Sequence, residues 1–291
     1  MNTSLSSYPK VSVALPVYNT QERHLRECIE SILSQSFTDF ECIIYNDAST
    51  LPYVDSCIRS YNDSRIRYYT SSVNRGISAT RNAILRLVQG EYIAIADHDD
   101  ISLPQRFEKQ VAVLEHNPEI GIVSSLVQTF PKKAIWNNYE MDDDIKALLF
   151  SSCSILHPAS MIRTSLLRGN NIEYEEAFSP AEDYMLWCRC MQYTQFYTIQ
   201  EVLLLYRVHE KNTSRVECDK MNEATKRIKA IMKNDNPVLY TLALAQYEQK
   251  QYRNLSIRLF GIIPFLTRKR KGRYVYWYLF HYIPFLRYRV I

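Results

Sequence analysis

Short apolar runs alternate with amphipathic segments between residues 11 and 124 of this chain. The runs predict strands, and apolar residues that recur every three to four positions predict helices between them. The expected strands cover residues 11–15, 40–45, 65–69, 91–96 and 120–124, and the expected helices cover 25–33, 53–61, 78–89 and 104–116. Repeated strand–helix units with short connections are typical of an α/β fold, in which helices cover both faces of a mostly parallel sheet.

Polar segments follow three of the expected strands. They are residues 16–19 (Pro-Val-Tyr-Asn), 46–50 (Asn-Asp-Ala-Ser-Thr) and 97–100 (Asp-His-Asp-Asp). Ligands of an open parallel sheet bind outside the carboxyl ends of its strands, so we expect these segments to share one rim. There Tyr18 can stack on a base, and Asp47 can accept a hydrogen bond from a base or ribose. Either residue alone is more often a packed aromatic or a turn residue, whereas together they indicate a nucleotide site.

The acidic segment 97–100 also suits a divalent cation. Asp97 and Asp99 are two positions apart. In extended backbone both side chains therefore project to the same side and can reach one ion at about 2.1 Å, the Mg²⁺–oxygen distance. An isolated Asp-x-Asp is more often a solvated turn. Its place after a buried strand, beside two other polar segments, favours a metal that bridges a diphosphate.

The composition indicates a globular protein of a reducing compartment. The chain has 291 residues, 46% of them apolar, which suits one large or two modest domains. Its seven cysteines show no paired Cys-x-x-Cys spacing. Buried free thiols explain them better than disulfides or zinc, which predicts a cytoplasmic location. Residues 1–9 lack a secretory pattern, and no run of about 18 apolar residues predicts a spanning helix.

Charge is unevenly distributed along the chain. Ten lysines and arginines and no acidic residue follow Glu248, whereas residues 1–248 contain 25 basic and 31 acidic residues. Two similar apolar octads, residues 259–266 and 279–286, flank the basic run 267–273. Interleaved aromatic and basic residues predict a helical extension that binds an anionic membrane surface. The alternatives are a packed subdomain and nucleic-acid binding, and we expect no nucleic-acid partner because proline-broken apolar octads suit lipid better than a phosphate groove.

Seven motifs along the chain resemble one enzyme family. In order and spacing they are similar to the family-2 inverting glycosyltransferases of the GT-A fold, of bacterial lipopolysaccharide or capsule type. The first five motifs are residues 13–19, 31–37, 46–49, 74–82 and 90–100, and the acidic motif and closing segment are 181–187 and 205–209. The resemblance implies a Rossmann-like GT-A domain over residues 1–215. Residues 216–291 are then the helical, basic-aromatic extension.

The resemblance also implies roles for single residues. It implies a nucleotide-sugar donor, most often a UDP-sugar, and a Mn²⁺ or Mg²⁺ ion held by Asp97, Asp99 and His209. The residues implied at the donor are Pro16, Val17, Tyr18, Asn19, Asp47, Arg75, Asp97 and His98. His98 departs from the family, which commonly has a small residue in this slot.

An acidic pair at the start of an expected helix supplies the remaining chemistry. Sugar transfer to a hydroxyl needs a base for the acceptor proton and a cation for the leaving diphosphate. The resemblance implies that Asp183 is the base, with Glu182 against the acceptor or as the less favoured base. The same pair suits the first turn of a helix, and both interpretations can hold at once. Trp187 and His157 could border the acceptor, although core roles are commoner for both.

Two further polar features keep more than one interpretation. Arg81 could face the donor or pair with a local carboxylate. The acid run 142–144 is interpreted as the charged first turn of a helix and not as a second metal site.

These features together predict an inverting hexosyl- or N-acetylhexosaminyltransferase that is peripheral on the inner face of the cell membrane. We expect its acceptor to be a lipid-linked or lipooligosaccharide-type glycan. Two alternatives remain: a non-catalytic nucleotide-sugar-binding or scaffold protein, and a metal-dependent nucleotidyltransferase. The last would release pyrophosphate, whereas a sugar transferase releases a nucleoside diphosphate.

Overall fold

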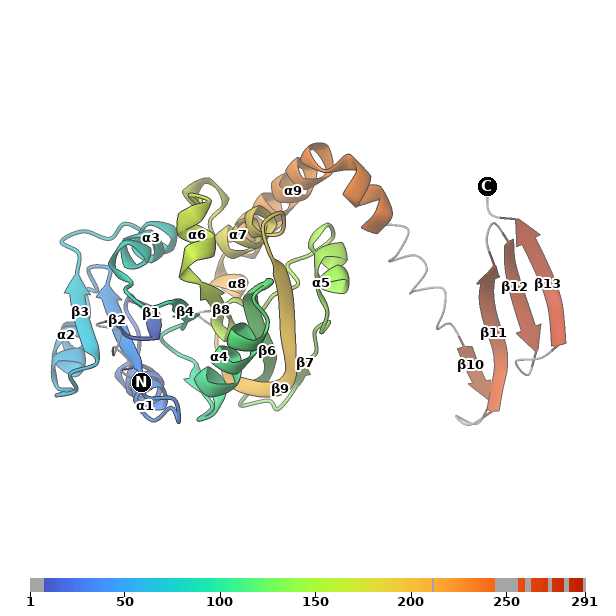
Figure 1. The fold of residues 1–291 in the computed structure, drawn as a ribbon. Coiled ribbons are helices and arrows are strands. Elements are labelled where there is room, and N and C mark those ends of the chain that lie inside the picture. The colour runs from blue at the N-terminus through green and yellow to red at the C-terminus, as the bar shows by residue number, and fades with distance from the viewer. Residues whose placement is uncertain are drawn as a thin grey trace, which may run out of the picture. The chain divides into compact units, whose positions relative to one another are not determined.

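The computed structural model confirms the α/β fold. It describes residues 8–210, 212–243, 256–259, 263–271, 274–279 and 283–289. The chain divides into two compact units, Met1–Ile231 and Met232–Ile291 (Figure 1). The first unit contains one mixed sheet with helices packed on it, and every residue predicted at the site belongs to this unit.

The main sheet has the strand order β3-β2-β1-β4-β8-β6-β9-β5, with β7 paired to β6. Its strands are β1 (Val11–Val17), β2 (Phe40–Asn46), β3 (Ile66–Thr70), β4 (Tyr92–Ile95), β5 (Ile101–Ser102), β6 (Ile120–Phe130), β7 (Ile135–Trp136), β8 (Met161–Arg163) and β9 (Gln195–Arg207). β3, β2, β1 and β4 pair in parallel, as do β6 and β9, whereas β8 and β5 pair antiparallel with their neighbours. The strand order reverses at β1, so the carboxyl ends of β1 and β4 open the crevice where such sheets bind ligands.

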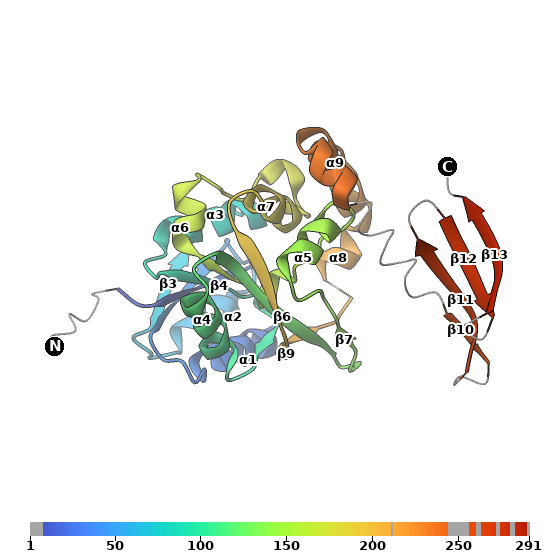
Figure 2. The same ribbon diagram turned by 45° about the vertical axis from the view of Figure 1, so that its right-hand side comes forward.

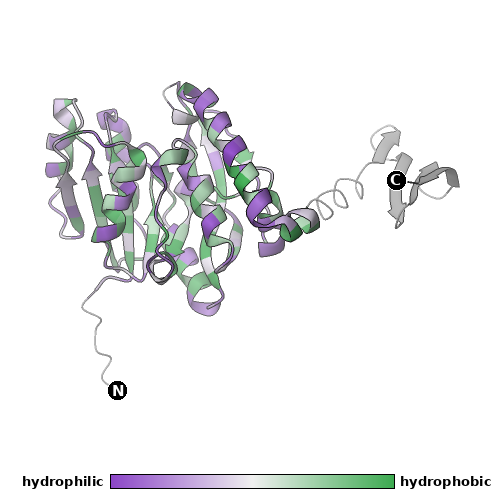
Figure 3. Ribbon diagram, turned by 90° about the horizontal axis from the view of Figure 1, so that it is seen from above, coloured by the Kyte–Doolittle hydropathy of each residue, from purple (hydrophilic) through white to green (hydrophobic). Residues whose placement is uncertain are grey.

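The helices follow the amphipathic segments of the sequence. They are α1 (Glu22–Leu33), α2 (Pro52–Arg59), α3 (Ile77–Leu87), α4 (Arg106–His116), α5 (Asp142–Leu149), α6 (Thr164–Gly169), α7 (Glu182–Cys190), α8 (Thr213–Val216) and α9 (Cys218–Asp235), with 3₁₀ turns η1 (His157–Ala159) and η2 (Glu176–Phe178). In α1 the buried residues Leu25, Cys28, Ile29 and Ile32 recur at helical spacing. The acid run 142–144 forms the first turn of α5, as its sequence predicts. Hydrophobic ribbon is concentrated in the interior strands, and hydrophilic ribbon lies on outer helix surfaces (Figure 3).

A fully buried arginine fixes the end of β4, directly before the acidic segment 97–100. Arg106 Nη2 donates to the carbonyl oxygens of Ile95 (2.7 Å) and Ser160 (3.1 Å), and Nη1 donates to Ser102 Oγ (3.0 Å). Burial lowers the pKa of this guanidinium to about 10, and the nearby Asp100 opposes that shift. Arg106 thus joins β4, β5 and the segment before β8 beneath the site.

The prediction of a helical C-terminal extension holds only in part. Helices α8 and α9 begin the region after residue 215, but the described segments beyond residue 255 are strands. They form an antiparallel sheet of β10 (Ser256–Leu259), β11 (Ile263–Lys271), β12 (Tyr274–Leu279) and β13 (Ile283–Arg289). The physical reason is composition, because β12 consists of tyrosine, valine, tryptophan and leucine, and aromatic and β-branched residues favour strands. The side chains of the octads and of the basic run between them lie outside what the structure describes.

No helix within the described ranges is both long and apolar enough to cross a membrane.

Candidate active site

The rim predicted from the sequence forms at the carboxyl ends of β1 and β2. Val17 and Asn46 are register partners, and the N–H of Asp47 donates to the carbonyl oxygen of Val17 at 2.9 Å. The side chain of Asp47 is buried and accepts the backbone N–H groups of Arg75 and Gly76 at 2.9–3.1 Å. Because Gly76 precedes α3 with φ +84°, this carboxylate fixes the loop that starts α3.

The donor residues predicted on this rim have different surroundings. Pro16 and Val17 are buried in β1, so their contribution is the position of the backbone. Asn19 has φ 47°, and its Oδ1 accepts from the N–H groups of Thr50 (2.8 Å) and Leu51 (3.3 Å) at the start of α2. Its amide therefore holds the loop together. Tyr18, with 43% of its surface exposed, and Arg75 are the most exposed residues of this group.

The acidic segment after β4 meets His209, which lies 110 residues farther along the chain. His209 Nε2 and Asp99 Oδ2 are 2.7 Å apart. Asp97 instead accepts a hydrogen bond from Arg81 Nη2 at 3.2 Å, and His98 lies partly exposed beside Asp99. Within the described ranges no three or more histidine, cysteine, aspartate or glutamate side chains gather as a complete ligand set.

The donor atoms at Asp99 and His209 nevertheless fit a divalent ion. Neighbouring ligands of an octahedral ion with 2.1 Å bonds lie about 3 Å apart, close to the observed separation of Asp99 Oδ2 and His209 Nε2. Carboxylate oxygen suits Mg²⁺ and Mn²⁺, and the imidazole adds a nitrogen ligand. The fit covers two ligands, and Asp97 would complete the set only after leaving Arg81.

Helix α1 holds this part of the site from the outside. Glu27 forms an ion pair with Arg207, whose Nε donates to the carbonyl oxygen of Asp99 at 2.7 Å. The backbone N–H of Arg207 also donates to Asp100 Oδ1 at 2.9 Å. His24 stacks on His209, with 5.9 Å between ring centroids. These contacts hold the segment after β9 against residues 97–100, which explains how His209 reaches Asp99.

The acidic pair at the start of α7 is asymmetric. Glu182 is buried, and its Oε1 accepts from Arg81 Nη1 at 2.5 Å. Asp183 is partly exposed and accepts the backbone N–H of Tyr184 at 2.7 Å. Burial, and after it the neighbouring Glu182 carboxylate, raise the pKa of Asp183 to about 7, although Arg81 and the Tyr184 N–H act in the opposite direction. A carboxylate with such a pKa is suited to accept a proton near neutral pH.

His157 and Trp187 form part of a buried aromatic cluster behind the acidic pair. His157 Nε2 lies 2.9 Å from the hydroxyl of Tyr174, and the His157 ring lies 5.7 Å from the ring of Trp187. Burial lowers the pKa of His157 well below its ordinary value, so the ring is neutral. Asn82 anchors Tyr174 through both backbone groups at 2.8 Å. His157 and Trp187 both pack in the interior, which supports the core role that was the predicted alternative to an acceptor contact for each of them.

Three residues of the site have partners that the sequence analysis did not name. Arg81, which was expected either to face the donor or to pair with a local carboxylate, pairs with Asp97 and with Glu182. Arg207 and Glu27 hold the closing segment, and neither had a sequence role. The sequence did contain one indication that Arg81 and Arg207 belong to the site. They lie within the motifs 74–82 and 205–209 that resemble the family.

Comparison with known proteins identifies the class. Residues 12–169 match the family described as Glycosyl transferase family 2. A glycosyltransferase of Methanocaldococcus jannaschii without an assigned activity is 33% identical over 223 residues, which cover 73% of this chain and 76% of that protein. The chain therefore belongs to glycosyltransferase family 2, and it is a glycosyltransferase, as the sequence motifs predict.

Solved structures share the fold. S. aureus TarS (residues 1–349) in complex with UDP-GlcNAc superposes with a TM-score of 0.67 at 18% identity, covering 84% of this chain and 72% of that chain. A mannosyltransferase of Pyrobaculum calidifontis in complex with GDP-mannose and Mn²⁺ gives a TM-score of 0.55 at 17% identity, covering 82% and 74%. This likeness confirms the predicted GT-A architecture.

Proposed function

We propose that this protein is an inverting glycosyltransferase that moves a sugar from a nucleotide donor to a hydroxyl group of a glycan. The observation that carries the proposal is the position of Asp183. A partly exposed carboxyl group with a pKa of about 7 lies one residue from Glu182, and Arg81 joins Glu182 to Asp97 of the acidic segment. A proton acceptor and a diphosphate site are thus held in one network, as transfer to a hydroxyl requires.

The donor is a UDP-sugar held on the rim of β1 and β2. The exposed ring of Tyr18 offers a stacking surface for the base, and Asp47 orders the loop that carries Arg75. The guanidinium of Arg75 binds the base or the diphosphate from the solvent side. The fold shared with TarS, whose structure contains UDP-GlcNAc, supports a UDP-sugar and a hexosyl or N-acetylhexosaminyl group.

A Mn²⁺ or Mg²⁺ ion is held by Asp99 and His209, with Asp97 as the third ligand beside the ribose and diphosphate. When bound, the ion neutralises charge that develops on the leaving diphosphate. His98, which is partly exposed next to Asp99, lines the donor side. Arg207 and Glu27 keep His209 in reach of Asp99.

Asp183 takes the proton of the acceptor hydroxyl. As the acceptor oxygen loses its proton to Asp183 it bonds to the sugar carbon, and the bond from that carbon to the nucleoside diphosphate breaks, which releases the diphosphate. This single displacement inverts the configuration at that carbon. Glu182 is the less suitable base because its carboxylate is buried and engaged by Arg81. It acts instead on Asp183, whose proton affinity it raises.

The acceptor belongs to a lipid-linked or lipooligosaccharide-type glycan at the cytoplasmic face of the membrane. Ten basic residues and no acidic residue follow Glu248, which supports attraction of the C-terminal region to an anionic surface. The protein is then a peripheral membrane enzyme, with its catalytic residues in the first unit.

A donor screen tests the proposed function. The full chain is incubated with Mn²⁺ and each of several UDP-, GDP- and nucleoside-triphosphate compounds, and heat stability and released products are measured. We expect a UDP-sugar to raise the melting temperature and to yield UDP slowly in water. Release of pyrophosphate from a nucleoside triphosphate would favour a nucleotidyltransferase, and binding without any turnover would favour a scaffold protein.

A further inference from the structure

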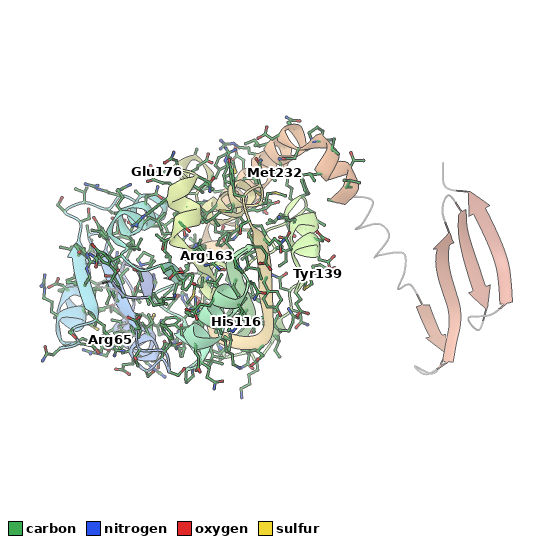
Figure 4. All side chains as sticks on the ribbon, in the orientation of Figure 1. Arg65, His116, Tyr139, Arg163, Glu176 and Met232 are labelled. Atoms are coloured by element: carbon green, nitrogen blue, oxygen red, sulfur yellow. The ribbon has the colours of Figure 1, made fainter. Side chains whose placement is uncertain are left out.

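The segment that follows β6 has exposed apolar side chains. Between residues 135 and 141 four large residues are at least two-fifths exposed, namely Ile135 (53%), Trp136 (42%), Tyr139 (40%) and Met141 (58%). β6 and β7 form a hairpin at the edge of the first unit (Figure 2), and Tyr139 lies farther along the same segment, beside α5 (Figure 4). A large apolar side chain that is exposed in this way can mark a binding surface.

The ring of Trp136 is held in place by a second aromatic ring. Trp136 and Tyr206 pack with 4.9 Å between centroids at an interplanar angle of 40°. Tyr206 in turn packs on the buried cluster of Val127, Ala159 and Leu204. The indole is therefore supported from beneath while much of its surface stays open to solvent. A supported, exposed ring loses little conformational freedom when it binds a ligand.

This pair of rings connects to both halves of the active site. Tyr206 is directly followed by Arg207, which donates to the Asp99 carbonyl oxygen beside the proposed metal. On the other side, Leu156 packs on the same buried cluster as Tyr206, and the next residue, His157, contacts Trp187 of α7. Helix α7 begins with the acidic pair that contains Asp183. At the end of β6, Arg207 also lies over the ring of Phe130 at 4.4 Å, so the hairpin that carries Trp136 begins beside the residue that holds Asp99.

We propose that Trp136 and Tyr206 form a subsite for a sugar ring of the acceptor glycan, beyond the residue that receives the new sugar. A sugar ring has apolar C–H faces and a rim of hydroxyl groups, and its apolar face matches an exposed indole face. Asn137 is exposed next to Trp136 and supplies an amide for those hydroxyls. The proposal rests on the proposed function in one respect, that the acceptor is a glycan.

A membrane surface is the main rival occupant. Lys132 and Lys133 are exposed in the turn of the hairpin, and anionic lipid attracts such residues. The exposed Asn137, next to Trp136 in the chain, argues against it, because an amide disfavours insertion into lipid. The same amide suits the hydroxyl groups of a sugar.

Four proteins test the subsite: the wild type, Trp136→Ala, Trp136→Phe and Tyr193→Ala. Tyr193 is 56% exposed and lies beyond the end of α7, so it is the matched aromatic control. Each protein is applied to a panel of immobilised neutral and acidic oligosaccharides. We expect the wild type to bind at least one of them, Trp136→Ala to bind it about tenfold more weakly, and the Phe variant and the control to bind nearly as the wild type does.

The outcomes separate this inference from the proposed function. Failure of the wild type to bind any oligosaccharide, or unchanged binding by Trp136→Ala, overturns the subsite. Weaker binding of Trp136→Ala to anionic vesicles, with unchanged oligosaccharide binding, assigns the surface to lipid. UDP-sugar binding, measured in parallel by calorimetry, is expected to be equal in all four proteins. If the wild type bound no UDP-sugar, the proposed function would be refuted. The effect of Trp136→Ala on oligosaccharide binding would still test the subsite independently.

Discussion

Arg81 and Glu182 form a buried ion pair at 2.5 Å, although 101 residues separate them in the sequence. The same guanidinium donates to Asp97 at 3.2 Å and lies over the ring of Tyr174. One cation of α3 therefore joins the acidic segment after β4 to the helix that carries Asp183. If the carboxylate of Asp97 or Glu182 moved away, the positive charge of Arg81 would be only partly neutralised. An incompletely paired charge is costly in the protein interior.

Removal of this cation is expected to destabilise the fold. In Arg81→Gln the buried Glu182 carboxylate loses its partner, and breaking a buried pair from one side costs about 3–5 kcal/mol. Urea unfolding of the variant beside the wild type measures this loss. The double variant Arg81→Gln/Glu182→Gln carries no unpaired carboxylate at residue 182 and is expected to recover part of it. If Arg81→Gln alone were as stable as the wild type, the Arg81–Glu182 ion pair would contribute little to the free energy of unfolding.

Loss of the base is expected to separate donor binding from turnover. Asp183→Asn keeps the size of the side chain but cannot take a proton, so the transfer rate should fall by about 10²–10⁴. Affinity for the UDP-sugar should stay near that of the wild type because Asp183 does not contact the rim of β1 and β2. Calorimetry with the donor and a transfer assay measure the two quantities. Near-normal turnover would move the base to Glu182.

Activity is expected to rise with pH through about 7. The pKa of Asp183 is raised to about 7, so the group is protonated and inactive as a base below that pH and ionised above it. Because Glu182 contributes to this raised pKa, Glu182→Gln should move the acid side of the pH–rate profile to lower pH. Initial rates between pH 5 and 9 for both proteins provide the measurement. A shift to higher pH, or none, would contradict the assigned coupling.

The strands and the rim could be predicted because their signals are local. Apolar runs fix β1, β2 and β4, and the polar residues that directly follow each strand must lie at its carboxyl end. The pairing of Asp99 with His209 was accessible only through the family motifs. Their 110-residue separation is closed by β9 and by the contacts of Arg207, which no local pattern encodes.

Residues whose roles depend on distant partners could not be assigned in this way. The amphipathic pattern of α1 identifies its buried face but gives no reason for Glu27 to pair with Arg207. Asn19 stays a predicted donor residue, and no local pattern encodes that its amide oxygen also accepts a hydrogen bond from the backbone before α2. The helical expectation for the region beyond residue 255 failed because octads rich in Leu, Phe, Ile and Pro carry no clear period, and aromatic residues at alternate positions favour strands.

Removal of the metal ligand is expected to abolish turnover. Asp99→Ala deletes the oxygen closest to His209, so Mn²⁺ binding should weaken strongly and transfer should nearly cease. Excess chelator added to the wild type should produce the same loss, and Mn²⁺ should restore only the wild type. Titration of Mn²⁺ by electron paramagnetic resonance provides a reading that is independent of activity. The exposed variant Asp55→Ala, whose ion pair lies on α2, is the control. Full transfer by folded Asp99→Ala would refute this assignment.

Deletion of residues 255–291 is expected to remove membrane binding and leave the chemistry intact. The deleted segment contains eight of the ten basic residues that follow Glu248, and none of the site residues. It lies within the second compact unit, Met232–Ile291, whereas Asp99, Asp183 and His209 belong to the first. The truncated protein should therefore no longer sediment together with vesicles that contain anionic lipid. Its rate of transfer to a short soluble acceptor should stay largely unchanged. High salt should release the full chain only in part, because apolar burial adds to the electrostatic attraction. Unchanged sedimentation of the truncated protein would exclude the membrane role, and loss of folding would assign the octads to a packed core.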